Sequence, residues 1–323
     1  RRTRRKEDLA LIRSGYEPWA PVVERMAIVL VGVAAVFIAF SSYHDEIRHG
    51  AMIKVEHVCC LAYGSLCVAL DLSIKSAARA NGGAYSFNPA CATVAVDTLK
   101  LIASLLLFGC SACSDRKQGK AVVLPGISDA AWLALPGFVF FCENLLLYQA
   151  IERCPLSAFG VICMTMLMWN AILWALVFGT PIGRMRWTAI VILFLGCVGN
   201  QLPSFFGSGF TWGVLWALAL AFANAAGGAA AEFALKRRAA MDINVQNSVL
   251  YFCMVCYGTV YLLVAQMDTL RGGFFSGFTP QCVQVVILQV LLGLSVSRIL
   301  KYMDAVTKTV VASLPGPGAI FFR

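Results

Sequence analysis

The sequence predicts an all-α polytopic membrane protein. Hydrophobic residues make up 59% of the 323 positions and charged residues only 13%, whereas soluble domains carry roughly a quarter charged residues. Mean hydropathy is +0.76. Apolar stretches of about 17 to 25 residues recur along the chain, and such stretches can cross a bilayer core of about 30 Å as helices. The short segments of alternating hydrophobicity that are typical of a transmembrane β-barrel are not visible.

The apolar stretches also predict the order of the helices. A first apolar run covers residues 26–42 and follows a basic segment. The connections between the later runs are short, which leaves no room for a separate soluble domain. We expect helices at 57–74, 91–110, 130–151, 155–179, 187–203, 210–235, 246–266 and 282–303, and a last one that begins near residue 304.

The basic residues indicate topology rather than binding to nucleic acid. The net charge is +9, and many basic residues lie in the short connections at 114–120, 181–186 and 236–242. Basic loops normally stay on the cytosolic side of a membrane, so we expect these three connections to be cytosolic. The basic N-terminal segment would then face the other side if 26–42 crosses the membrane, and the sequence leaves open whether it does.

Neither a metal site nor a cofactor is expected. Most of the 13 cysteines stand alone inside apolar runs, where a free thiol behaves as a small hydrophobic group. The CSAC motif at 110–113 has the spacing of a metal-binding pair, but a second pair and a nearby histidine are missing. Because the sequence also lacks a nucleophile–base set and a phosphate-binding loop, we do not expect an enzyme.

Two predicted helices carry charged pairs inside apolar sequence. Asp97 and Lys100 are spaced i and i+3, and Glu232 and Lys236 are spaced i and i+4, so each pair lies on one helix face. A charge at the middle of a membrane helix costs roughly 2.5–3.5 kcal/mol and usually has a partner or a function. The alternative is that these side chains lie at helix ends and extend to the membrane surface.

A third charged stripe lies near the end of the chain. Lys301, Asp304 and Lys308 fall at i, i+3 and i+7, on one face if the helix is continuous. Two lysines stand against one acid in this stripe, which leaves one cation in excess. A cation in excess inside a helical bundle favours an anionic substrate, and lysine is a suitable partner for phosphate.

Several segments resemble one family, in the same order and at that family's spacing. Together they resemble the nucleotide-sugar transporters of the drug/metabolite transporter superfamily, in the branch that handles CMP-sialic acid, UDP-galactose and UDP-N-acetylglucosamine. The resemblance runs from about residue 57 to 312. The segments are VDTLKLIAS (96–104), ENLLLYQAI (143–151), RWTAIVILFLGCVGNQ (186–201), AEFALK (231–236), VQNSVLY (245–251) and LGLSVSRILKYMDAVTKT (292–309).

The resemblance implies a fold of two inverted five-helix repeats with the substrate held at their interface. Ten helices are then expected, and the last apolar stretch here corresponds to the ninth, so we expect a truncated C-terminus. We accordingly divide the chain into a basic N-terminal segment with the extra apolar run at 1–56, a first helical repeat at 57–203 and an incomplete second repeat at 204–323.

The resemblance also implies a substrate-binding site, with no catalytic residue and no metal ligand. Lys301 is expected to contact the nucleotide phosphates, and Asn144 to hydrogen-bond the nucleotide. Asp97 and Lys100 are expected to form a cavity pair on the opposing half. The remaining candidate residues for substrate binding are Asp304, Lys308, Tyr302, Asn247 and Glu232.

The chain departs from the family at several positions of one helix and at Ala230, where relatives carry a tyrosine. Where family members carry two tyrosines and a lysine, this sequence has Phe159, Cys163 and Met166. One cationic side chain and two side chains that contact the base in relatives are therefore replaced. This change favours a substrate that differs from those of the relatives.

The function implied by the resemblance is that of a secondary transporter. It would exchange a cytosolic nucleotide sugar for a lumenal nucleoside monophosphate across a Golgi or endoplasmic reticulum membrane, in contact with membrane lipid and without nucleic acid. A homodimer is compatible with the sequence. Two alternatives stay open, namely a transporter of another solute within the superfamily and a non-transporting relative that acts as a scaffold. A panel of competing nucleotides distinguishes the first alternative, and a co-purifying protein without exchange activity distinguishes the second.

Overall fold

The computed structural model describes most of the chain between residues 85 and 302. The predicted run at 26–42 and the helix expected from residue 304 lie outside the described residues, and the helix expected at 57–74 is described only in short pieces. The described ranges are 85–117, 125–153, 165–179, 181–185, 187–192, 194–196, 212–237 and 241–302, with short pieces between 63 and 74 and between 159 and 163.

Five helices are long and apolar enough to cross a membrane. Each coincides with a helix that the apolar runs predict, and the ends differ by one to three residues except that α5 continues seven residues further, to Lys117. An all-α polytopic membrane protein is therefore confirmed as the fold class. The five helices are α5 (Pro89–Lys117), α6 (Ile127–Arg153), α10 (Gly213–Arg237), α11 (Ile243–Ala265) and α13 (Pro280–Tyr302).

Three shorter helices lie in two of the predicted apolar runs and in one connection. Helix α8 covers Thr165–Phe178, within the run expected at 155–179, and Trp187–Gly196 is a short apolar helix within the run expected at 187–203. The sequence does not predict α12 (Met267–Gly272), which lies in the connection between α11 and α13. The residue that follows it, Gly273, has a φ of 107°, a conformation that favours glycine.

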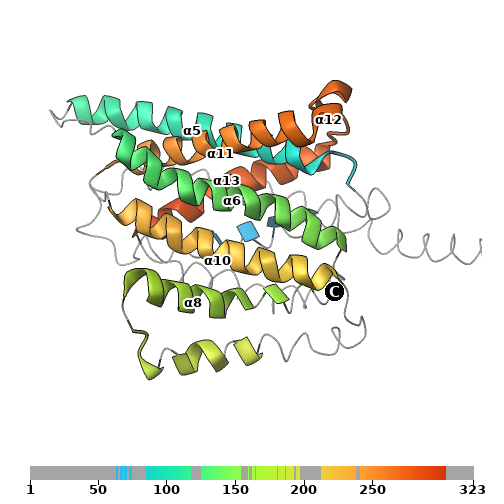
Figure 1. The fold of residues 1–323 in the computed structure, drawn as a ribbon. Coiled ribbons are helices and arrows are strands. Elements are labelled where there is room, and N and C mark those ends of the chain that lie inside the picture. The colour runs from blue at the N-terminus through green and yellow to red at the C-terminus, as the bar shows by residue number, and fades with distance from the viewer. Residues whose placement is uncertain are drawn as a thin grey trace, which may run out of the picture.

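The long helices pack around α6 and α11. Helix α10 lies between α6 and α8, while α11 packs against both α5 and α6, and α13 packs against α5 (Figure 1). The contact between α6 and α10 depends on Gly227, because a Cβ at this position would lie 2.9 Å from two ring carbons of Phe140. Glycine therefore permits the close approach of these two helices.

Two hydrogen bonds and one contact between aromatic rings show which helix ends lie together. Ser111 near the end of α5 donates a hydrogen bond of 2.8 Å to Asp242, the residue that precedes α11. The Trp174 indole of α8 donates to Glu232 of α10 at 3.2 Å, near the ends of both helices. The ring of Trp132 near the start of α6 contacts Phe233 of α10. The helix ends that border the three basic connections are therefore at one end of the bundle.

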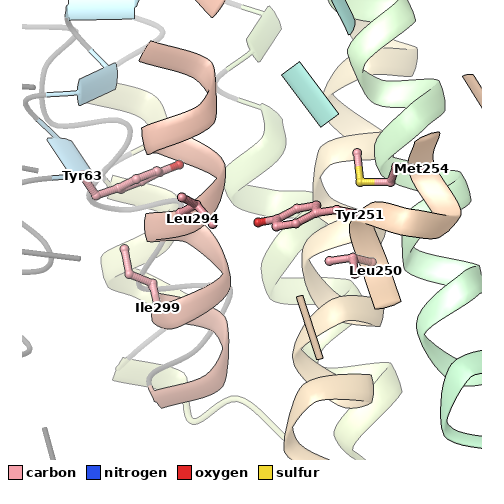
Figure 2. Packing of buried hydrophobic residues seen from close by; sticks show 6 residues of the cluster. All are labelled: Tyr63, Leu250, Tyr251, Met254, Leu294 and Ile299. Carbon is pink, nitrogen blue, oxygen red and sulfur yellow. The ribbon is translucent and has the colours of Figure 1, made fainter. Parts of the chain in front are cut away.

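The outer surface of the bundle is apolar, unlike the surface of a soluble protein. Large apolar side chains such as Leu106 and Val264 are exposed, as expected for helices that face lipid. Inside, a cluster of buried residues joins α11 to α13, and Figure 2 shows the Tyr251 ring extending from α11 toward α13. This cluster consists of Tyr63, Leu250, Tyr251, Met254, Leu294 and Ile299.

Candidate functional site

Helix α5 presents a buried polar stripe to the interior of the bundle. Asp97, Lys100 and Ser104 are spaced i, i+3 and i+7, so they share one face, and all three are buried. Lys100 Nζ donates to Asp97 Oδ1 at 3.2 Å. Neither Asp97 Oδ2 nor Ser104 Oγ has a hydrogen-bond partner among the residues that the structure describes. Buried polar atoms without partners are rare and point to a ligand or ordered water.

Helix α11 carries a matching stripe formed by Asn244, Asn247 and Tyr251, also at i, i+3 and i+7. Asn247 is fully buried, and both atoms of its amide lack a hydrogen-bond partner within the described part of the chain. The Tyr251 hydroxyl donates to Gly293 O at 3.1 Å and lies 2.9 Å from Ser297 Oγ. Helix α11 thus contributes one fully used polar group and one unused amide.

The two stripes lie at the same depth in the bundle. Helices α5 and α11 are antiparallel, since Ser111 contacts Asp242 while Lys100 Nζ lies 5.6 Å from the centroid of the Tyr251 ring. Counting inward from these two contacts places Ser104 at the level of Asn247. The polar atoms without partners on the two helices are therefore at similar depths in the bundle.

Helix α13 provides the third wall. A Cβ at Gly293 would lie 2.5 Å from Lys100 Cε, so the absence of a side chain leaves room for the lysine. Arg298 is only 1% exposed, and it donates from Nη1 to Leu294 O at 3.0 Å and from Nη2 to Asn244 Oδ1 at 3.2 Å. We use the term polar cluster for Asp97, Lys100, Ser104, Asn244, Asn247, Tyr251, Ser297 and Arg298.

The polar cluster has the chemistry of a binding site for an anion that also carries hydrogen-bonding groups. It combines an ammonium, a guanidinium, an amide and hydroxyls within a membrane protein, where buried ionisable residues commonly mark substrate pathways. The carboxylate of Asp97 offsets one of the two positive charges. Within the described ranges, His, Cys, Asp and Glu side chains do not form a group suited to a metal ion.

Of the residues that the sequence predicts for the site, the structure pairs Asp97 with Lys100. It also places Asn247 about one helical turn from Tyr251, over whose ring Lys100 lies. Lys301 lies at the end of α13, where its ammonium donates to the carbonyl oxygen of Met241 rather than facing Lys100.

Three further candidates lie at or beyond the end of α13. Tyr302 is the last residue of the helix. Asp304 and Lys308 fall outside the described residues, so their predicted role in binding stays a prediction.

Asn144 lies on the same face of α6 as Tyr148, one helical turn away. Tyr148 is buried in a cluster with Val96 of α5 and Val286 of α13, so this face of α6 is directed toward the helices that carry the polar cluster. The Asn144 side chain makes no hydrogen bond to another residue in the part of the chain that the structure describes. Its predicted contact with a nucleotide therefore depends on position alone.

Glu232 lies outside the polar cluster. It is fully buried and accepts hydrogen bonds from Lys236 at 2.6 Å and from the indole of Trp174 at 3.2 Å. These contacts direct the carboxylate toward α8, whereas the polar cluster is enclosed by α5, α11 and α13. The structure thus assigns Glu232 to the contact between α10 and α8.

Sequence reasoning does not identify Ser104, Ser297 or Arg298 as site residues. A signal for two of them is nevertheless present in the sequence. Ser104 extends the spacing of Asp97 and Lys100 by one more turn, and Arg298 precedes Lys301 by three residues, which places both on one side of α13. Ser297 has no comparable signal, because serine is common in membrane helices.

Comparison with known proteins identifies the family. The family model for nucleotide-sugar transporters matches residues 51–316. CMP-sialic acid transporter 2 of Oryza sativa subsp. indica is 25% identical over 236 residues, which cover 72% of this chain and 66% of that protein. CMP-sialic acid transporter 4 of Arabidopsis thaliana is 23% identical over 240 residues, with 72% of this chain and 67% of that protein covered.

The UDP-N-acetylglucosamine transporter of Homo sapiens is 27% identical over 238 residues, which cover 69% of this chain and 72% of that protein. The chain thus spans 66% of the length of the rice relative. The family match covers most of the chain and agrees with the resemblance of the individual segments. The chain therefore belongs to the nucleotide-sugar transporter family, a family of transporters and not of enzymes.

Proposed function

We propose that this chain transports a nucleotide sugar across an internal membrane. The observation that carries the proposal is the polar cluster, which places Lys100, the amide of Asn247 and the ring of Tyr251 inside a bundle of membrane-spanning helices. A charged group inside a bilayer is costly unless polar or oppositely charged side chains surround it. Membership of the nucleotide-sugar transporter family supports the same substrate class.

The side chains of the cluster correspond to the parts of such a substrate. The Lys100 ammonium would neutralise phosphate charge, and Asp97 holds this ammonium in place when no phosphate is near. Both atoms of the Asn247 amide are available to a base or a sugar hydroxyl. The Tyr251 ring, whose hydroxyl is held by α13, offers an aromatic face.

The transport cycle that we propose is an exchange. A nucleoside monophosphate shares the nucleotide half of a nucleotide sugar, so the same cluster would bind both on opposite sides of the membrane. The basic helix ends gathered at one end of the bundle would face the cytosol, and the compartment would be the Golgi or the endoplasmic reticulum. Rocking of one helical half against the other would alternate access to the cluster.

The test is transport by the purified full chain in proteoliposomes. A panel of labelled UDP-sugars, CMP-sialic acid and GDP-sugars is supplied outside, with and without nucleoside monophosphate inside. We expect uptake of at least one nucleotide sugar, stimulated by internal monophosphate. Lys100→Gln should lower this uptake by roughly tenfold or more, the effect of losing about 1.4 kcal/mol of binding.

Arg271→Gln serves as the matched control for the loss of one positive charge. Arg271 lies in α12 and its side chain is 76% exposed, so this variant should transport like the unaltered protein. Uptake of none of the nucleotide sugars by folded protein would contradict the proposal. So would Lys100→Gln protein with unchanged uptake.

A further inference from the structure

Two cysteines near the end of α5 are exposed at the outer surface of the bundle. Cys110 and Cys113 are spaced i and i+3, so they lie on one side of the helix. Free cysteine is among the residue types that are most often buried, where it packs as a small hydrophobic group. Because these two side chains are exposed, their thiols are accessible to a reagent from outside the bundle.

Both thiols lie on the face of α5 that is turned away from the other helices. Asp97, Lys100 and Ser104 define the buried face, and Ser111 on that same side donates to Asp242 at 2.8 Å. Helix α5 itself lies at the outer edge of the bundle (Figure 1). The exposed residues in the second half of α5 recur at helical spacing on the opposite face, and they are Leu99, Ile102, Leu105, Leu106, Gly109, Cys110 and Cys113.

The depth of the two thiols follows from the length of the apolar span. This span covers Pro89–Cys113, and the charged residues at 115–117 follow it directly. A helix of 25 residues is about 37 Å long, which exceeds the bilayer core of about 30 Å. Cys113 therefore lies at the membrane surface, and Cys110 lies about 4.5 Å deeper along the helix axis. In the orientation proposed above, this is the cytosolic surface.

The local geometry leaves room for a lipid chain on either sulfur. Cα–Cβ bonds of a helix tilt toward its N-terminus, and from Cys113 this direction leads into the bilayer. A Cβ at Gly109, one turn before Cys113, would meet nothing within 4 Å, so the adjoining surface is open. A chain attached here would pass over Leu106, which is 67% exposed.

We propose that Cys110 and Cys113 are sites of reversible S-acylation by a long-chain fatty acid. Cysteines at the cytosolic boundary of a membrane helix are typical sites of this modification. The cysteine sulfur attacks the carbonyl carbon of a fatty acyl-coenzyme A, and the bond from this carbon to the coenzyme A sulfur breaks. The thiol proton passes to the released coenzyme A, and one thioester replaces another without oxidation or reduction. A membrane acyltransferase would catalyse the transfer.

The chain contains a second pair of cysteines that differs in depth. Cys253 and Cys256 have the same i and i+3 spacing in α11, and Cys256 is exposed. Helix α11 covers Ile243–Ala265, so Cys256 lies about 13 Å or more from either end of the helix. An enzyme that works at the membrane surface does not reach this depth. The second pair is therefore a matched control for thiols of equal spacing.

The test is metabolic labelling of the full chain in eukaryotic cells with an alkyne-tagged palmitate. Label per amount of purified, monodisperse protein is measured before and after hydroxylamine, which cleaves thioesters. We expect hydroxylamine-sensitive label on the unaltered chain. The Cys110→Ser, Cys113→Ser variant should lose this label, whereas Cys253→Ser, Cys256→Ser should keep all of it.

Two added thiols separate depth from mere exposure. Each is placed in the Cys110→Ser, Cys113→Ser background. Gly109→Cys lies in the same part of the helix and should restore the label. Ile102→Cys lies on the same exposed face but about 12 Å deeper than Cys110, so it should not. Restoration by Gly109→Cys also shows that the loss reflects the missing thiols and not a folding defect.

Several results would overturn the proposal. They are an unaltered chain without hydroxylamine-sensitive label, full label on Cys110→Ser, Cys113→Ser protein, and loss of label from Cys253→Ser, Cys256→Ser protein. Equal restoration by Ile102→Cys and Gly109→Cys would contradict the role of depth. The proposal does not depend on the substrate, so uptake of nucleotide sugars by the Cys110→Ser, Cys113→Ser protein tests the proposed function separately.

Discussion

The ion pair between Asp97 and Lys100 shows how a single buried interaction serves both stability and binding. Both side chains are buried, and Lys100 Nζ donates a hydrogen bond of 3.2 Å to Asp97 Oδ1. Removal of one partner of a buried pair leaves an uncompensated charge, whereas removal of both does not. The pair thus keeps a lysine available for an anion at a depth where an isolated charge would be costly.

Asp97→Asn should therefore destabilise the protein by about 3 kcal/mol. The Asp97→Asn, Lys100→Gln double variant should be more stable than Asp97→Asn alone, because it leaves no unpaired charge. Unfolding of the three proteins in the same detergent measures both effects. Asp268→Asn is the control, because it breaks the exposed pair with Arg271 and should change stability little. Equal stability of the single and double variants would show that the pair is not coupled.

At the scale of elements, the contact between α6 and α10 depends on small residues. Helix α10 contains the run ANAAGGAAAE, and small residues allow membrane helices to approach closely. Gly227 faces the ring of Phe140 and the side chain of Val139 of α6. The same two helices are also joined by a hydrogen bond from the Asn224 amide to the Glu143 carboxylate. Packing and one polar contact together set the position of α10 against α6.

Gly227→Val should destabilise the protein by about 1–3 kcal/mol, since its Cβ would overlap the Phe140 ring. The same substitution in a Phe140→Ala background should cost less, because the shortened side chain makes room. The four proteins of this cycle are compared by thermal unfolding. Gly109→Val is the control, since a Cβ at Gly109 meets nothing within 4 Å. An equal loss of stability from Gly227→Val with Phe140 and with Phe140→Ala would show that Gly227 and Phe140 are not in contact.

At the scale of the whole molecule, the helix ends beside the basic connections lie together, and α12 lies at the opposite end of α11. Because basic loops stay on the cytosolic side, this arrangement predicts one orientation for the entire bundle. The polar cluster then lies between the two ends, bordered on one side by the contact of Lys301 with Met241 and on the other by the hydrogen bonds from the Asn88 amide to Gln266 and Thr269.

Single cysteines placed in a cysteine-free variant test this orientation. Ile127→Cys and Gly183→Cys lie at the basic end, and Phe275→Cys lies at the other end, all at exposed positions. In sealed vesicles with the cytosolic face outward, a membrane-impermeant maleimide should label the first two. Phe275→Cys should react only after the membrane is permeabilised. Labelling of Ile127→Cys and Gly183→Cys from opposite sides would contradict the common end.

The sequence was sufficient to predict the class of the protein, its long helices and its family. These features depend on local properties, namely the length and polarity of apolar runs and the order of short motifs. The pairing of Asp97 with Lys100 was predictable for the same reason, since residues three apart on one helix are neighbours whatever surrounds them. The short helix α12 was not predicted, because glycine-rich sequence at 272–277 indicates a loop.

Only the tertiary structure decided which faces of the helices meet. Packing of α5, α11 and α13 brings Lys100 over the ring of Tyr251 and Arg298 against Asn244, although these residues are far apart in the sequence. In the same packing, Glu232 accepts a hydrogen bond from Trp174 of α8, and the Lys301 ammonium donates to the carbonyl oxygen of Met241. Helical periodicity defines a face, but the partner of that face depends on side-chain shape and helix register across the whole bundle. For this reason the polar cluster emerges from the structure and not from any one motif.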